Sequence, residues 1–278
     1  MILRAQPFKE KMLEDLSKRQ DIRAHVIVIQ VGDNPASNKY IANKQKLMDA
    51  VGIKHRLIKL EEDVPQSRVE EVIKLVNGYC NVTGLMVQLP LPKGMDEEYL
   101  LNLISPEKDI DCLSEGSLGK LFNLDRCTAQ PCTPKGIISL LNYYNIDVVG
   151  KDVCIVGRSN IVGASLGTIL TKMGATVTIC HSKTRNLARK TLLADIVICA
   201  IGKPKFFDSN YFNPDAVVID VGINIDEKGK LCGDVDFDDV VNNVYAISPV
   251  PGGVGVMTVC SLIENTINLA DKARQKIK

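Results

Sequence analysis

The chain of 278 residues contains no tryptophan, only three histidines and no long apolar run. A membrane-spanning helix needs roughly 18 or more consecutive apolar residues, so we expect no membrane partner. The formal net charge is +1, which gives no electrostatic reason to expect binding of nucleic acid. Residues 1–11 lack a secretory h-region and a small-residue cleavage site, which favours a cytoplasmic location.

The nine cysteines are scattered, and the chain has neither a Cys-x-x-Cys pair nor a histidine cluster. Zinc sites and redox dithiols need such spacings, so the sequence gives no support for a bound metal. Cys154, Cys180 and Cys199 fall in short apolar runs, where a thiol behaves as a small hydrophobic side chain. We therefore expect structural thiols in a reducing compartment.

Apolar runs alternate with helical patterns in the first part of the chain. Strands are expected over 24–31, 55–60 and 82–89, and helices over 7–18, 37–51, 67–77 and 97–104. Ser37 is the predicted N-cap of the second helix. This βα alternation predicts a parallel sheet covered by helices. Residues 107–134 show no such pattern and are expected to form a long functional loop or a passage between domains.

The alternation restarts after a helix that Thr133, as N-cap, and Pro134 are expected to open. Strands are expected over 153–156, 176–180, 196–200, 217–221 and 244–247, followed by an amphipathic helix over 257–277. The sequence therefore predicts an α/β protein with two α/β domains, the second of Rossmann type, with a cleft between them.

The most informative stretch is 153–163, V-C-I-V-G-R-S-N-I-V-G. An apolar strand ends at Gly157, and a helical pattern begins after Gly163. The free N–H groups and positive dipole at the start of such a helix suit a phosphate group. The spacing is not G-x-G-x-x-G, so this turn alone is equally typical of a dinucleotide site and of an ordinary βα connection.

The end of the next strand indicates which nucleotide such a site would bind. In units that bind NAD, this position commonly has an acid for the ribose 2′-hydroxyl. Here the strand 176–180 is followed by H-S-K-T-R, which contains no carboxylate. Arg158 and Ser182 would instead hold a 2′-phosphate, which predicts NADP. Lys183 and Arg185 are equally well explained as solvated surface charges.

A second set of polar residues lies in the first half of the chain. Tyr40 and Lys44 are four residues apart on one predicted helix, so they share a face. Y-x-x-x-K is also typical of an exposed lysine beside a half-buried tyrosine. Gln88 ends the third strand in L-M-V-Q-L-P-L-P, where open α/β sheets place ligand-binding groups. Asp109 and Asp111 follow in P-E-K-D-I-D-C, where either could simply cap a turn.

Nine motifs occur between about residues 31 and 260: V-G-D-N-P-A-S-x-x-Y-x-x-x-K, V-Q-L-P-L-P, P-E-K-D-I-D, P-C-T-P-K-G, V-G-R-S-x-I-V-G, C-H-S-K-T, D-V-G-I-N, G-D-V and S-P-V-P-G-G-V-G. The last is stiff at its prolines and open to close backbone approach at its glycines. Together they resemble the bifunctional methylenetetrahydrofolate dehydrogenase/methenyltetrahydrofolate cyclohydrolase family.

This resemblance implies NADP-linked oxidation of 5,10-methylenetetrahydrofolate and hydrolysis of the methenyl product to 10-formyltetrahydrofolate, in one-carbon metabolism. Lys44 would be the key hydration residue, and repulsion by the methenyl cation would favour its neutral amine. The implied folate ligands are Tyr40, Gln88, Leu89, Asp111, Pro249, Gly252 and Gly253. The implied cofactor ligands are Gly157, Arg158, Ser159, Ser182 and Ile223. The resemblance also implies a homodimer formed through the second domain.

The implied folate-binding, catalytic domain comprises residues 1–130 and 257–278, and the NADP-binding domain comprises residues 131–256. Three residues depart from the family pattern: Cys112 replaces glycine, and Ser165 and Val256 replace prolines. We expect Cys112 to be the cysteine most worth testing with thiol reagents. The alternatives are a dehydrogenase without hydration activity, an enzyme similar to shikimate or amino-acid dehydrogenases, and a non-enzymatic NADP sensor.

Overall fold

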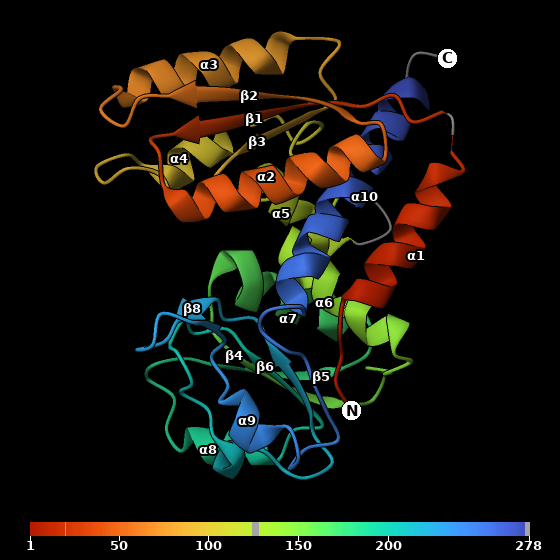
Figure 1. Cartoon of the computed structure of the whole chain (residues 1–278), viewed down its shortest axis with the longest axis vertical. Helices are drawn as coiled ribbons and strands as arrows, with labels where there is room; N and C mark the ends of the chain where they lie inside the picture. The colour runs from red at the N-terminus through yellow and green to blue at the C-terminus, as the bar shows by residue number, and fades with distance from the viewer. Residues whose placement is uncertain (20, 124–127, 276–278) are drawn as a thin grey trace. The chain divides into compact units, whose positions relative to one another are not determined.

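The computed structural model describes residues 1–19, 21–123 and 128–275, and the chain forms two compact α/β units. Unit 1 consists of Met1–Lys11 and Thr133–Thr258, and unit 2 consists of Met12–Cys132 and Val259–Lys278. Each unit has its own parallel sheet (Figure 1). Within the described ranges, no helix has the length and apolar character needed to cross a membrane.

The sheet of unit 2 has three parallel strands in the order β2-β1-β3. They are β1 (His25–Val31), β2 (Lys54–Leu60) and β3 (Gly84–Val87). The helices of this part of the chain are α1 (Gln6–Ser17), α2 (Pro35–Ala50), α3 (Gln66–Gly78), α4 (Glu97–Asn102) and α5 (Glu115–Leu118). Helices α2 and α3 cover opposite faces of the sheet (Figure 1). The central strand β1 is therefore buried from Val26 to Val31, as expected for a parallel strand covered on both faces.

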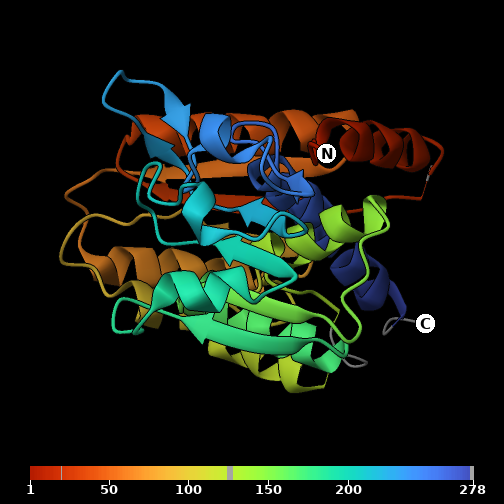
Figure 2. The same cartoon turned by 90° about the horizontal axis from the view of Figure 1, so that it is seen from below.

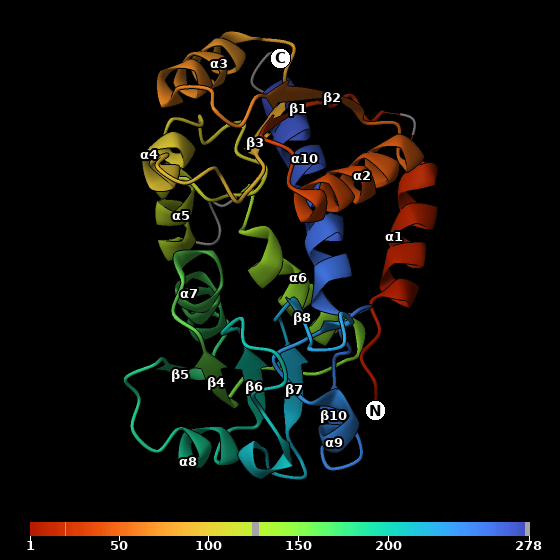
Figure 3. The ribbon, with the colours of Figure 1, turned by 60° about the vertical axis from the view of Figure 1, so that its left-hand side comes forward.

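The sheet of unit 1 has five parallel strands in the order β10-β7-β6-β4-β5. They are β4 (Asp152–Val156), β5 (Thr176–Cys180), β6 (Ile196–Cys199), β7 (Val217–Asp220) and β10 (Ala246–Ile247). The helices are α6 (Cys132–Tyr143), α7 (Ser165–Lys172), α8 (Leu187–Leu192), α9 (Phe237–Val240) and α10 (Val254–Gln275), which continues into unit 2. The strand order reverses between β4 and β6 (Figure 3). Ligands of doubly wound sheets bind at such a reversal.

A short antiparallel hairpin follows the parallel strand β7. It consists of β8 (Asn224–Ile225) and β9 (Leu231–Cys232). The hairpin, drawn in light blue, projects from unit 1 in Figure 2. Two apolar cores pack against the two faces of the unit 1 sheet, and neither core contains a residue of β8 or β9. The hairpin therefore lies outside the layered part of the fold.

The start of α2 differs from the sequence prediction, which placed the N-cap at Ser37. Asn34 is the cap, because its side-chain oxygen accepts hydrogen bonds from the backbone N–H groups of Ala36 and Ser37, at 2.9 and 3.1 Å. Pro35 then occupies the first helical position, where its missing N–H has no effect. Ser37 instead donates its hydroxyl to the carbonyl oxygen of Leu89, at 3.3 Å.

The segment 107–134, predicted as a loop, contains regular structure. Ser114 caps the four-residue helix α5, and a 3₁₀ turn, Gly119–Phe122, follows it. Such short helices leave no periodic signal in a sequence. The helix α6 begins at Cys132, so Thr133, the predicted N-cap, lies inside the first turn. Residues 124–127 of this segment lie outside the described residues.

The first residues of the chain also differ from the expected division, which placed residues 1–130 in one domain. Residues 1–11 cluster with unit 1. Leu3 donates its N–H to the carbonyl oxygen of Ile247 at 2.8 Å, and Ala5 donates to that of Gly252 at 2.9 Å. Both side chains are fully buried in the core of unit 1. These contacts explain why residues 1–11, which include the first part of α1, belong to unit 1 while the rest of α1 belongs to unit 2.

Candidate active site

The carboxyl ends of β1 and β3 meet at one edge of the unit 2 sheet, where the strand order reverses. The helix α2 begins directly after β1 and carries Tyr40 and Lys44 four residues apart on one face. Gln88 and Leu89 follow β3, and the Gln88 N–H donates to the carbonyl oxygen of Ile29 at 2.8 Å. Four predicted site residues thus lie around one switch point of the sheet.

Lys44 is buried, with only 7% of its surface exposed. Its Nζ donates to Oε1 of Gln88 at 3.1 Å and lies 3.7 Å from Sδ of Met86. The Gln88 amide is oriented by its own Nε2, which donates to the carbonyl oxygen of Leu89 at 2.7 Å. No carboxylate among the described residues forms an ion pair with Lys44. Burying a lysine without such a partner is costly, which indicates a functional amine.

Tyr40 is half-buried on the same helix face. Burial raises the pKa of Tyr40, so the phenol stays protonated at neutral pH. Its hydroxyl makes no hydrogen bond with the residues that the structure describes. The ring and the hydroxyl are therefore available for contact with a ligand, whereas proton abstraction by Tyr40 is disfavoured.

The structure distinguishes Asp109 from Asp111. The buried carboxylate of Asp109 accepts hydrogen bonds from the backbone N–H groups of Cys112, Leu113 and Ser114, at 2.9, 3.0 and 2.9 Å. It therefore holds the turn. A parallel bridge aligns Asp109 with Leu85 of β3, which places Asp111 beside the carboxyl end of that strand. Within the described ranges, the Asp111 carboxylate has no hydrogen-bond partner, so it is free to accept ligand donors.

The glycine turn after β4 lies at the switch point of unit 1. Gly157 has a φ of 141°, and a methyl group on its Cα would clash with the carbonyl oxygen of Ala200, which follows β6. Only glycine allows the ends of β4 and β6 to approach this closely. Ser159 caps the next turn by accepting a hydrogen bond from the Val162 N–H, at 3.3 Å.

Arg158 and Ser182 leave neighbouring strands at the same edge. Val156 and Cys180 are paired in register, and each predicted cofactor residue lies two positions beyond its strand. Both residues are exposed, as is Ser159. No carboxylate follows β5 in this loop, so the donors at the edge can all face an anion. Ile223, which follows β7, is also exposed.

The predicted ligand residues Pro249, Gly252 and Gly253 belong to unit 1. The preceding Ser248 extends the pairing of the sheet by donating its N–H to the carbonyl oxygen of Val218, at 3.0 Å. The loop contains a cis peptide bond before Pro251 and ends where α10 begins. The roles of these residues stay predictions.

Two buried carboxylates, Asp220 at the end of β7 and Asp234 just after β9, were not assigned a role from the sequence, although D-V-G-I-N and G-D-V contain them. Asp220 accepts hydrogen bonds from the N–H groups of Gly222, Asp234 and Val235, at 3.1, 2.9 and 3.0 Å. Burial raises the pKa of Asp220 to about 7, and the Asp234 carboxylate acts in the same direction against the three N–H donors. An aspartate at the end of an otherwise apolar strand was the available signal.

Each of the three departures from the family motifs has a local explanation. Cys112 has a φ of 57°, the left-handed conformation that glycine adopts without strain. Val256 lies in the first turn of α10, where proline is tolerated, whereas Ser165 continues the helical turn 160–164 and donates its N–H to the carbonyl oxygen of Val162, a hydrogen bond that proline could not form. Cys112 is buried, so we expect slow modification by thiol reagents, in contrast to the exposed Cys80.

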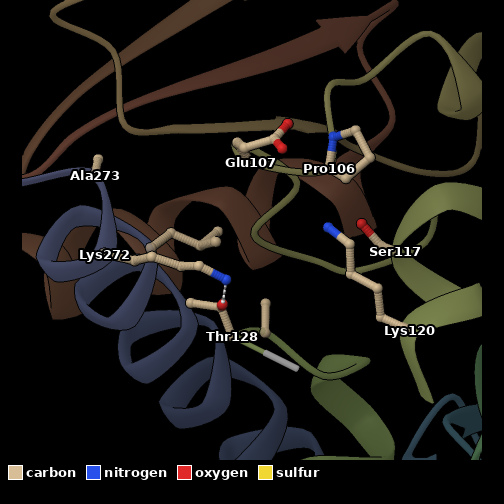
Figure 4. Close-up of a pocket in the computed structure, with 9 residues that line it drawn as sticks. Pro106, Glu107, Ser117, Lys120, Thr128, Lys272 and Ala273 are labelled. Atoms are coloured by element: carbon tan, nitrogen blue, oxygen red, sulfur yellow. Dashed lines mark hydrogen bonds between the residues drawn. The ribbon is translucent and has the colours of Figure 1, made fainter. Parts of the chain in front are cut away.

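A hollow of about 310 Å³ in unit 2 lies apart from these residues (Figure 4). Its lining residues are Pro106, Glu107, Ser117, Lys120, Thr128, Ala129, Leu269, Lys272 and Ala273. Lys272 donates to the hydroxyl of Thr128 at 2.6 Å. None of the predicted site residues lines this hollow, so the strand ends are the better candidate for chemistry. Within the described ranges, no group of three acidic, cysteine or histidine side chains could hold a metal ion.

The reversed parallel sheet, its glycine turn and the donors at its edge define an α/β protein with a Rossmann-type nucleotide-binding unit. Two family models match the chain. Residues 3–111 match the catalytic domain of tetrahydrofolate dehydrogenase/cyclohydrolase, and residues 131–274 match its NAD(P)-binding domain. The chain therefore belongs to the tetrahydrofolate dehydrogenase/cyclohydrolase family.

Individual relatives agree with this assignment. The bifunctional protein FolD of Bacillus cereus is 46% identical over 92% of this chain and 89% of its own length. The FolD crystal structure from Campylobacter jejuni is 39% identical, with a TM-score of 0.93 over 98% of this chain and 99% of that one. The Trypanosoma brucei enzyme, complexed with NADP and an inhibitor, is 30% identical, with a TM-score of 0.91 over 100% and 98%.

A more distant structure shares only the fold. Shikimate dehydrogenase from Aquifex aeolicus is 13% identical, with a TM-score of 0.54 over 92% of this chain and all of that one. This likeness gives no support to the alternative of a shikimate-like activity, because identity this low shows the architecture alone.

The raised pKa of Asp220 predicts how stability depends on pH. The folded protein holds this proton up to about pH 7, whereas an unfolded aspartate releases it near pH 4. The free energy of unfolding should therefore fall as pH rises from 4 to 7, by up to about 4 kcal/mol from this group. Urea unfolding across this range should show a shallower slope for Asp220→Asn. Asp215→Asn, at an exposed carboxylate that accepts no hydrogen bond from the residues that the structure describes, should keep the wild-type slope, and equal slopes in all three proteins would contradict the assignment.

Proposed function

We propose that the protein oxidises 5,10-methylenetetrahydrofolate to 5,10-methenyltetrahydrofolate with NADP and then hydrolyses the product to 10-formyltetrahydrofolate. Family membership and the relatives named for both activities support this function. The observation that carries the hydration step is the buried pair of Lys44 and Gln88, 3.1 Å apart. NADP, when bound, supplies the acceptor for the hydride.

The residues at the edge of the unit 1 sheet fit this cofactor. Arg158, Ser159 and Ser182 offer a guanidinium and two hydroxyl groups without a competing acid in the loop after β5. A 2′-phosphate gains charge-assisted hydrogen bonds from such a set, whereas an unmodified ribose gains little. We assign these residues to the cofactor, with Gly157 allowing the close turn and Ile223 contributing apolar contact.

The hydration step needs a group that moves protons. As water forms a bond to the electrophilic methenyl carbon, it must lose a proton, and the neutral amine of Lys44 accepts it. Lys44 then returns that proton to the ring nitrogen as the carbon–nitrogen bond breaks, and the remaining hydroxyl proton is released to solvent as the formyl carbonyl forms. Gln88 accepts a hydrogen bond from Nζ and so aims the amine.

The remaining folate contacts extend the proposal. Tyr40 would stack on the folate ring system, and the unpaired Asp111 carboxylate would accept hydrogen bonds from pterin nitrogens. Leu89 and the segment Pro249–Gly253 would contribute apolar and backbone contacts. The alternative of a dehydrogenase without hydration activity would not need the Lys44–Gln88 pair, so retention of that pair favours the bifunctional enzyme.

The homodimer and the cytoplasmic location also stay predictions. A dimer through unit 1 is supported by the projecting hairpin, on which Ile225 and Leu231 are 61% and 40% exposed. Apolar side chains at a hairpin edge are typical of a surface that another chain covers.

Lys44→Met should separate the two activities. The methionine fills a similar volume without a basic nitrogen, so hydration should fall at least a hundredfold, while NADP-dependent formation of the methenyl product should be largely retained. Both rates can be followed through the absorbance of methenyltetrahydrofolate. Lys46→Met, at an exposed position on the same helix, is the matched control and should retain both activities. An equal loss of both activities with folate binding intact would contradict the role of Lys44.

Arg158→Ala should change cofactor preference. Loss of one charge-assisted hydrogen bond, about 1.5–3 kcal/mol, should weaken NADP binding about ten- to a hundredfold and leave NAD binding nearly unchanged. Titration of the reduced cofactors by fluorescence measures both affinities. Arg189→Ala, at an exposed position on α8, should affect neither. Equal weakening of NADP and NAD by Arg158→Ala would show that Arg158 does not read the 2′-phosphate.

A further inference from the structure

Asp234 is fully buried, and its carboxylate has four hydrogen-bond donors. Three are the successive backbone N–H groups of Ile201, Gly202 and Lys203, at 2.6, 3.1 and 2.8 Å. The fourth is the side-chain amide of Asn224, at 2.9 Å. Three consecutive N–H groups converge on one anion only when the backbone curves around it, so Asp234 fixes the shape of this loop.

The two segments that Asp234 holds follow neighbouring strands. Residues 201–203 come after β6, and Asn224 comes after β7. The first segment begins next to Ala200, whose carbonyl oxygen lies against Gly157 of the nucleotide turn. The second contains Ile223, which is assigned to the cofactor. The contacts of Asp234 therefore join two loops at the edge where the nucleotide is expected.

The packing leaves no room for an alternative arrangement. A methyl group on the Cα of Gly222 would clash with the Asp234 carboxylate, so only glycine fits there. Asp220 holds Asp234 from the other side by accepting its backbone N–H at 2.9 Å. Gly222 thus makes room for the side chain of Asp234, and Asp220 holds its backbone.

We propose that Asp234 is a positioning residue for the nucleotide site, which holds the loops after β6 and β7 in the shape that receives NADP. The inference rests on the proposed binding of NADP at this edge. Asp234 is fully buried and its oxygens are occupied by the loop donors, so it acts through the loops and touches no cofactor. Because the N–H groups of residues 201–203 donate to Asp234, they are not directed at the cofactor. The loops instead contribute their shape, and the groups that face outward, to the nucleotide site.

Asp234→Asn tests this role, because an asparagine turns one acceptor into an NH₂ group that opposes the loop donors. The KM for NADP should rise about ten- to a hundredfold, while kcat at saturating NADP stays within about threefold of wild type. Hydration of supplied methenyltetrahydrofolate, which needs no nucleotide, should also stay within about threefold. Asp238→Asn is the matched control, since Asp238 lies four residues along, is exposed and forms no hydrogen bond or ion pair with either loop in the part of the chain that the structure describes. It should leave the KM for NADP unchanged.

A second variant covers the case in which Asp234→Asn fails to fold. Asn224→Ala removes one of the four donors and keeps the carboxylate, so the KM for NADP should rise about three- to tenfold with hydration intact. An unchanged KM in a folded Asp234→Asn protein, or in Asn224→Ala when the first variant does not fold, would overturn the role of Asp234. Failure of the wild-type protein to bind NADP would instead overturn the proposed function, so the two failures are distinct.

Discussion

The constraint on which both sites depend is the reversal of strand order in each parallel sheet. In unit 2 the strand β2 lies on one side of β1 and β3 on the other, and in unit 1 the strand β5 lies on one side of β4 and β6 on the other. At such a point the two connections leave in opposite directions, so the carboxyl ends of two strands are left for other groups. Gln88 follows one of these ends, and the glycine turn at Gly157 follows another. The positions of Lys44, Gln88 and Arg158 follow from this rule of topology.

Buried charged groups then fix the loops at these edges. Asp109 satisfies three backbone N–H groups and leaves Asp111 available, and Asp234 satisfies three more beside the nucleotide turn. A carboxylate that accepts several backbone hydrogen bonds replaces the water that an irregular buried segment would otherwise need. Lys44 differs from these carboxylates, because its partners are an amide oxygen and a thioether. The two carboxylates thus shape the backbone, whereas Lys44 has no carboxylate partner among the described residues.

The strands and long helices were predictable because their apolar periodicity extends over many residues. The cap of α2 was predicted wrongly, because Asn34 and Ser37 are both good caps and only the geometry at Pro35 separates them. The helix α5 is too short to show a period. The Lys44–Gln88 contact joins two residues that the family motifs single out, although they lie 44 positions apart in the chain. The role of Asp234 could not be foreseen, because its donors come from loops that only the tertiary fold brings together.

The absorbance of methenyltetrahydrofolate tests the central claim most directly in the unmodified protein. With 5,10-methylenetetrahydrofolate as substrate, the signal should appear only when NADP is added and should then decay as 10-formyltetrahydrofolate forms. Methenyltetrahydrofolate supplied directly should decay at an enzyme-dependent rate without any nucleotide. A signal that forms without NADP, or a decay no faster than in buffer, would contradict the assignment of two chemical steps to this chain.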